Sequence, residues 1–119
     1  MINLAKEPPI EFMEDVSLKE FTIKGQDDFE YKFKYKPLDW YEEEKLFNEM
    51  TEINPFTKKV SINIPELTMQ SLLRTLKEAP FEISKENITK LKRNIVEQIM
   101  EIVGPKRMTE EMSKKSTGQ

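Results

Sequence analysis

The sequence contains no histidine and no cysteine, and only three of its 119 residues are glycine. Without histidine there is no imidazole to serve as a general base or a metal ligand. Without cysteine there are no disulfide bonds and no thiolate metal sites. Three glycines are too few for the glycine-rich loops that hold phosphates or dinucleotides. These absences predict a protein that is not an enzyme and has no cofactor and no metal site.

Long apolar runs are missing too. No segment approaches the roughly 20 apolar residues of a membrane span, and the start, MINLAKEPPIEF, lacks the basic and apolar stretches of a signal peptide. We therefore expect a cytoplasmic protein without a membrane partner. The 19 basic and 22 acidic residues nearly balance. A nucleic-acid partner is not expected, because such binders usually carry a clear basic excess.

Apolar residues make up 37% of the chain and fall in periodic blocks. The length predicts one domain, and the blocks place it at residues 18–104. Residues 1–17 are predicted to be an acidic, partly disordered arm, ordered only where Ile10, Phe12 or Val16 reach the core. Residues 105–119 have no periodicity and are predicted to be a disordered polar tail.

Two alternating runs predict a β-hairpin. Residues 18–24 alternate around Phe21 and Ile23, residues 29–35 carry an aromatic ring at every second position, and residues 25–28 form a turn cluster. Alternate side chains lie on one face of a strand. We expect the following residues to face the helices: Phe21, Ile23, Phe29, Tyr31, Phe33 and Tyr35.

Three helices are predicted after the hairpin. The first covers residues 39–53, with Asp39 as its cap. An extended segment at 60–64, which leaves a third short strand open, leads to a second helix that starts near Pro65 and ends before Ala79. The third covers 85–103 and follows the cap Ser84. The predicted fold is α+β, an antiparallel hairpin with three helices packed on one face.

Two acidic clusters have both a functional and a structural interpretation. Asp27, Asp28 and Glu30 could bind a hard cation, but calcium loops need more ligands at set spacing, so a solvated turn is favoured. The run at 42–44 could be an acidic site. The first turn of a helix is favoured, since negative charge there suits the helix dipole.

Two aromatic features also have alternatives. The run at 29–36 interleaves rings with lysines, as in sheets that stack bases. Core packing is favoured, because rings and lysines lie on opposite faces of a strand. Trp40 could be an exposed hot spot for a partner, although packing on the sheet edge is favoured.

The third helix is more apolar than one buried face requires. The surplus apolar surface could be buried against a second chain. Alternatively, the helix could be central and covered on several sides, and the sequence leaves both alternatives open. Adaptable methionines suit such binding surfaces. The candidate partner-binding residues are Leu72, Leu73, Leu76, Ile95, Ile99, Met100, Ile102 and Val103.

The order of these elements carries a family resemblance. Lys36-Pro37-Leu38-Asp39-Trp40 leads into an acidic helix, and Ser61-Ile62-Asn63-Ile64-Pro65 precedes a leucine-rich one. That helix contains Leu72 and Leu76 before Ala79-Pro80, and the step into the final helix is residues 83–91. Over residues 18–104 the chain resembles the tail assembly chaperones of long-tailed, siphovirus-like phages and related proviruses.

The resemblance implies a non-enzymatic assembly factor, which would work in the cytoplasm of the host cell. Such proteins bind the long, apolar, helical tape-measure protein and keep it soluble while the tail tube forms. Many are made in two lengths by ribosomal frameshifting, so a longer form of the chain itself is an expected partner. An A-rich run encoding Lys114-Lys115 would suit such slippage. Self-association is left open. The alternatives are a virion structural or head-tail joining subunit, or a small single-stranded nucleic-acid-binding protein.

Overall fold

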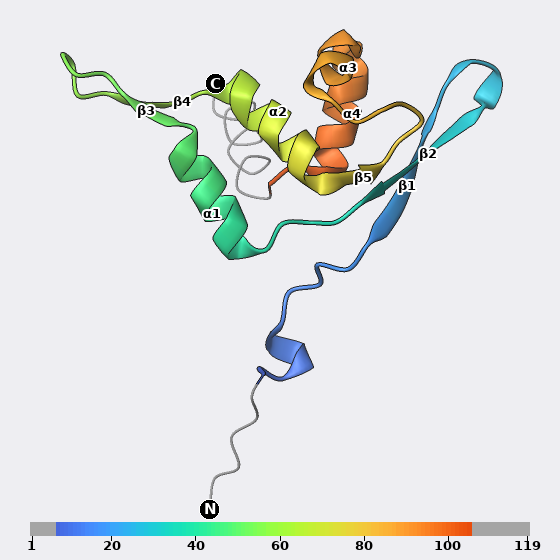
Figure 1. Cartoon of the computed structure of the whole chain (residues 1–119), viewed down its shortest axis with the longest axis horizontal. Coiled ribbons are helices and arrows are strands. Elements are labelled where there is room, and N and C mark those ends of the chain that lie inside the picture. The colour runs from blue at the N-terminus through green and yellow to red at the C-terminus, as the bar shows by residue number, and fades with distance from the viewer. Residues whose placement is uncertain (1–6, 106–119) are drawn as a thin grey trace, which may run out of the picture.

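The computed structural model describes residues 7–105, so residues 1–6 of the predicted arm and residues 106–119 of the predicted tail lie outside the described residues. The α+β class is confirmed. No helix in residues 7–105 is long and apolar enough to cross a membrane. The elements are β1 (Lys19–Lys24), β2 (Glu30–Tyr35), α1 (Trp40–Glu49), β3 (Thr51–Ile53), β4 (Val60–Ile62), α2 (Ile64–Thr75), β5 (Leu76–Glu78), α3 (Lys85–Lys90) and α4 (Arg93–Val103), with 3-10 turns at Ile10–Phe12 and Gln26–Asp28 (Figure 1).

The predicted hairpin is present as β1 and β2. The strands are antiparallel, with Phe21 opposite Phe33 and Ile23 opposite Tyr31. Asp27 and Asp28 both have φ of 58° in the connecting turn. Aspartate tolerates this left-handed conformation better than most side chains do, which explains the two consecutive aspartates.

The third strand of this sheet is β5, not the segment at 60–64. The strand order is β1-β2-β5, and Tyr35 lies opposite Leu76. The second helix was predicted to end just before Ala79, but it ends three residues earlier, at Thr75. The carbonyl of Thr75 instead accepts a hydrogen bond of 2.9 Å from the Lys36 amide. Pairing with the open edge of β2 replaces the last helical turn.

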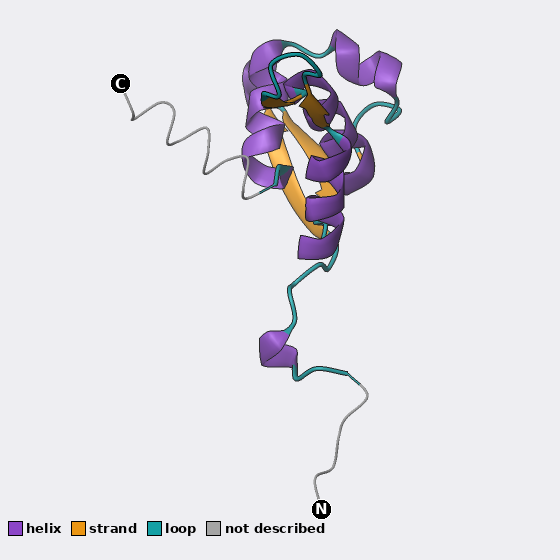
Figure 2. Cartoon of the chain, turned by 90° about the vertical axis from the view of Figure 1, so that its left-hand side faces the viewer, coloured by secondary structure: helices purple, strands orange, loops and turns teal. Residues whose placement is uncertain are grey.

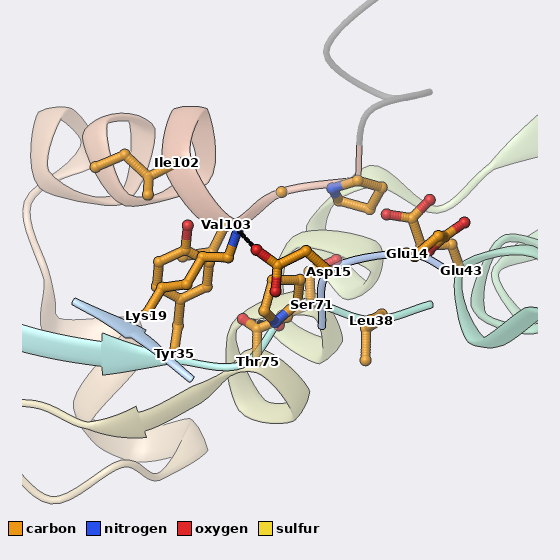
Figure 3. Close-up of a pocket in the computed structure, with 13 residues that line it drawn as sticks. Glu14, Asp15, Lys19, Tyr35, Leu38, Glu43, Ser71, Thr75, Ile102 and Val103 are labelled. Atoms are coloured by element: carbon orange, nitrogen blue, oxygen red, sulfur yellow. Dashed lines mark hydrogen bonds and ion pairs between the residues drawn. The ribbon is translucent and has the colours of Figure 1, made fainter. Parts of the chain in front are cut away.

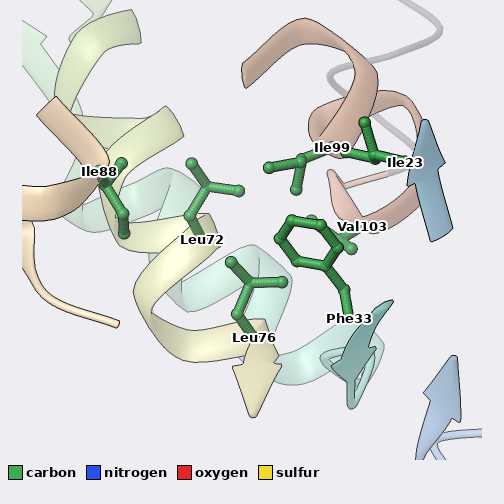
Figure 4. Packing of buried hydrophobic residues seen from close by; sticks show 7 residues of the cluster. All are labelled: Ile23, Phe33, Leu72, Leu76, Ile88, Ile99 and Val103. Carbon is green, nitrogen blue, oxygen red and sulfur yellow. The ribbon is translucent and has the colours of Figure 1, made fainter. Parts of the chain in front are cut away.

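The main core lies between this sheet and α2, α3 and α4, which cover one face of it (Figures 2 and 4). Phe33 stacks on Phe21 with ring centroids 4.8 Å apart. Phe29 and Tyr31 were also predicted to face the helices, but they are 60% and 42% exposed, because this end of the hairpin extends beyond the helices (Figure 1). The buried members of this cluster are Ile23, Phe33, Leu72, Leu76, Ile88, Ile99 and Val103.

A second, smaller core forms away from the sheet. Leu46 and Phe47 of α1 pack with Leu67 of α2, and Met50 and Ile62 pack against them. The first helix was predicted to pack on the sheet, and this was wrong: α1 packs on α2 (Figure 1).

The first and third helices were predicted too long. Residues 51–53 belong to β3, which pairs with β4, because Ile53 and Val60 are β-branched and directly opposite each other. The predicted helix at 85–103 is two helices, since Leu91 and Lys92 are extended, with ψ of 146° and 147°. The break lets Ile88 and Ile99 reach the same core.

The two ends of the described segment differ in their contact with the body. The described part of the arm leads away from it (Figures 1 and 2), and Ile10 and Phe12 are exposed, so neither reaches the core. Glu14 of the arm contacts the start of α1, because its Oε2 accepts a 3.1 Å hydrogen bond from the amide of Trp40. Pro105, predicted as the first tail residue, is buried.

Candidate partner-binding surfaces

The structure places half of the predicted partner-binding residues inside the domain. Leu72, Leu76, Ile99 and Val103 are buried in the main core. They cannot touch a partner while the domain keeps this fold, and the apolar width of the sequence at 72–103 is instead explained by packing on several sides.

The other four predicted residues are less buried. Leu73, Ile95 and Met100 are half-buried against the main core, and Met100 also packs against the second one. Only Ile102 is exposed, at 42%. The predicted stripe therefore does not form one continuous open surface.

An exposed apolar surface lies elsewhere, on the hairpin of β3 and β4, which we call the finger (residues 51–62). It projects from the body beside α1 (Figure 1). Ile53 and Val60 lie opposite each other, as do Thr51 and Ile62, so these four side chains share one face. We call this the finger face. Its other face carries Glu52 opposite Ser61.

The finger face joins the second core at one end and is open at the other. Ile62 is half-buried against Leu46 and its neighbours, whereas Ile53 and Val60 are 65% and 64% exposed. Apolar side chains that extend a core outward without cover are typical of an interaction surface.

The loop at the end of the finger has a defined conformation. The Asn54 side chain accepts hydrogen bonds from the amides of Phe56 and Thr57, at 2.9 and 3.2 Å. The Asn54 amide donates to the carbonyl of Lys59 at 2.9 Å, and Lys58 takes a φ of 60°. This turn holds Phe56 out in solvent, where it is 93% exposed.

A second exposed aromatic pair stands at the start of α1. Trp40 was predicted to pack on the sheet edge, but it is exposed and meets Tyr41 edge-on, with ring centroids 5.8 Å apart. The cap prediction beside it is confirmed, because Asp39 Oδ1 accepts a 2.8 Å hydrogen bond from the Glu42 amide. Because the Trp40 ring is exposed, the alternative that it contacts a partner protein stays possible.

The exposed rings at the tip of the first hairpin are those on which the nucleic-acid alternative depends. The rings of Phe29 and Tyr31 meet edge-on with centroids 4.8 Å apart, so the two ring planes are not parallel. The adjoining turn contributes Asp27 and Asp28, whose carboxylates would repel phosphates. No cluster of three or more acidic residues that could hold a metal occurs in the described part of the chain.

The described surface also contains a pocket of about 350 Å³. It lies where the arm, the start of α1, α2 and the end of α4 meet (Figure 3). Its lining is Glu14, Asp15, Lys19, Tyr35, Pro37, Leu38, Glu43, Ser71, Thr75, Ile102, Val103, Gly104 and Pro105.

Asp15, which lines the pocket, has a clearly shifted pKa. The Ser17 hydroxyl and amide both donate hydrogen bonds to it, and the Lys19 ammonium lies 3.1 Å from its Oδ2. These contacts favour the carboxylate and lower the pKa of Asp15 to about 2. It is therefore charged at neutral pH, with Lys19 as its ion-pair partner.

The sequence around the finger contains a hairpin pattern that competes with the predicted first helix. Thr51-Glu52-Ile53 and Val60-Ser61-Ile62 each alternate β-branched and polar residues around Asn54-Pro55. That pattern is typical of a hairpin. Because Ile53 also continues the helical stripe of α1, three residues were too few to separate the two periods.

Comparison of the chain with family models, with curated proteins and with solved structures gives no match.

Proposed function

We propose that the protein is a non-enzymatic tail assembly chaperone that binds apolar helical segments of a tape-measure-like protein. The sequence resemblance described above motivates this function. The observation that carries it is the finger face, where Ile53 and Val60 stand uncovered. An assembly factor that keeps an apolar client soluble needs such a surface, and the buried stripe of α2 and α4 does not provide it.

The finger face has the dimensions for a short helical contact. Three strand residues at about 3.4 Å each span about 10 Å, which matches two turns of a helix at about 5.4 Å each. A client helix with apolar residues at i, i+3, i+4 and i+7 presents a stripe of that length. Phe56 at the end of the finger and Ile64 at the start of α2 extend the exposed apolar area.

Weak binding at each segment is sufficient for this function. A tape-measure-like client offers many apolar segments along one chain, so several copies of the protein can bind it at once. Multivalent attachment raises the overall affinity without stronger single contacts. A longer, frameshifted form of the same chain would compete for the same segments.

The test is co-expression with the downstream tape-measure reading frame. The wild-type chain is expected to keep that protein soluble and to co-purify with it. Val60→Asp places a charge on the finger face, where desolvating it against an apolar helix is costly, so the client should precipitate. Ser61→Asp is the matched control, because it adds the same charge at the next position on the opposite face.

Two outcomes would contradict the proposal. A client that is equally soluble with and without this chain would remove the chaperone function. Equal effects of Val60→Asp and Ser61→Asp would remove the finger face as the binding surface.

The alternative of a virion structural or head-tail joining subunit is favoured by one observation, the projecting finger, whose two strands form a sheet of their own within the described residues. Such a sheet can accept a strand from a neighbouring subunit. A structural subunit would form a stable ring and remain in purified particles, whereas a chaperone would be absent from them.

A further inference from the structure

The strand β1 leaves one edge of the main sheet open. It stands at the end of the strand order β1-β2-β5. The Gly25 amide donates to the Phe29 carbonyl at 2.8 Å, and in an antiparallel ladder such hydrogen-bonded pairs recur at every second residue. Counting back from Gly25, the backbone amides and carbonyls of Glu20, Thr22 and Lys24 therefore point away from β2. Within residues 7–105, no backbone hydrogen bond from another segment reaches them.

This edge lacks the features that usually stop strands from pairing, which are short length, bulges, proline and charges that point inward. The strand β1 has six residues, contains no proline and keeps an unbroken register with β2. Its central side chains on the helix-covered face, Phe21 and Ile23, belong to the main core. The opposite edge strand, β5, has only three residues and a shifted register. Of the two edges, β1 is therefore the one suited to accept another strand.

The sequence of β1 is complementary to itself when two copies run antiparallel. With Thr22 opposite Thr22 of the second copy, Glu20 lies opposite Lys24 twice, on the exposed face of the sheet. On the other face, Phe21 lies opposite Ile23. Opposite charges, paired threonines and an aromatic ring beside a β-branched side chain each stabilise neighbouring strands.

The backbone supports the same register. Glu20, Thr22 and Lys24 all carry outward backbone groups, and in this register they meet one another, so each pair forms two hydrogen bonds. A shift of one residue would set outward groups against residues whose groups face β2. A shift of two residues would separate Glu20 from Lys24. The register centred on Thr22 therefore satisfies both the backbone and the charges.

We propose that two copies of the chain pair through β1 in this register. The dimer has a continuous sheet with the order β5-β2-β1-β1-β2-β5. The contact is isologous and closes on itself, so assembly stops at two copies. The finger projects from the opposite side of the body (Figure 1), so both finger faces stay uncovered in the dimer.

The first experiment is sedimentation equilibrium of the full chain over a concentration series. The wild-type mass is expected to rise from the 14.1 kDa of one chain toward twice that value. Thr22→Pro removes the central outward amide and should stay monomeric. Proline is tolerated in an edge strand where the N–H faces solvent, so the fold should persist, which circular dichroism checks. Thr22→Val keeps the amide and should dimerise with a Kd within about fivefold of wild type.

The second experiment tests the register by mixing two charge variants. Glu20→Lys places like charges opposite Lys24, and Lys24→Glu places like charges opposite Glu20, so each alone should raise the Kd at least about tenfold. In a mixed pair both facing positions carry opposite charges again, and the mixture should associate about as tightly as wild type. Glu20 also lies 3.6 Å from Lys34 of its own chain. Mixing leaves that contact unchanged, so recovery reports the contact between copies.

Three results would overturn the proposal. One is a wild-type chain that stays monomeric up to about 1 mM. Another is a folded Thr22→Pro variant that dimerises like wild type, which would place the contact on another surface, such as the finger. The third is a mixture of the charge variants that associates no more tightly than either alone. No client protein is present in these experiments, so their failure is distinct from failure of the proposed function.

Discussion

Ser71 is a buried residue of α2 that also lines the pocket beside the arm. Its hydroxyl is fully buried without a partner among residues 7–105, and it occupies a helix interior where alanine is intrinsically better. Ser71→Ala should therefore leave the free energy of unfolding unchanged or raise it by up to about 1 kcal/mol. Urea denaturation of both chains measures the difference. A loss of more than about 1 kcal/mol would mean that the hydroxyl is hydrogen-bonded in solution.

The aromatic residues of β2 are chemically alike, but their burial differs. Phe33 is buried and stacked on Phe21, whereas Tyr31, two residues earlier, is exposed. Phe33→Ala should cost about 3 kcal/mol or more, because it leaves a cavity in the main core. Tyr31→Ala should cost under about 1 kcal/mol. Thermal unfolding followed by circular dichroism compares the two, and a fully stable Phe33→Ala variant would contradict the assignment of the sheet face.

At the scale of elements, local chemistry predicted the starts of helices better than their ends. Asp39 and Ser84 are caps in the structure, as their side chains predicted, each accepting a backbone amide hydrogen bond. The ends at Glu49 and Thr75 depend instead on strand partners distant in sequence, β4 and β2. No glycine or proline marks the break at Leu91, so only the packing of α3 and α4 on one core accounts for it.

The burial of α4 changes what its substitutions should do. Met100 packs against both cores, while Lys92 is exposed at the helix start. Met100→Asp would place a charge among apolar side chains and should cost about 2–4 kcal/mol of stability. Lys92→Glu should change stability by less than about 0.5 kcal/mol. Guanidinium denaturation separates the two, and a Met100→Asp variant as stable as wild type would show that α4 does not join the two cores.

At the scale of the whole molecule, the candidate site was the least predictable part. The sequence gives apolar content, and both a core and a docking surface need it. The predicted stripe includes Leu72 and Ile99, which the fold uses internally, and it left out Ile53 and Val60, which the fold leaves exposed. Only the three-dimensional arrangement shows which apolar side chains the domain itself covers. The pocket was equally hidden, because its lining comes from segments as distant as Glu14 and Val103.

The two cores predict unequal local stability across the molecule. The main core joins the three-stranded sheet to α2, α3 and α4, whereas the finger is a two-stranded sheet held at one end by Ile62. Two strands alone are marginally stable in water, so amides of the finger should exchange with solvent through local opening. Amides of α2 near Leu72 should exchange only on global unfolding. Hydrogen-deuterium exchange followed by NMR measures both rates in the free protein.

Addition of the client then makes this difference a test of the binding surface. A helix seated on the finger face would cover Ile53 and Val60 and suppress local opening, because a ligand stabilises the closed state to which it binds. Exchange at the paired amides of β3 and β4 should slow at least about tenfold, while exchange near Leu72 should change much less. Val60→Asp should abolish the slowing and Ser61→Asp should preserve it. Faster exchange in α2 and α4, with the finger unchanged, would instead show that the client binds an opened form of the domain in which the stripe at 72–103 is exposed.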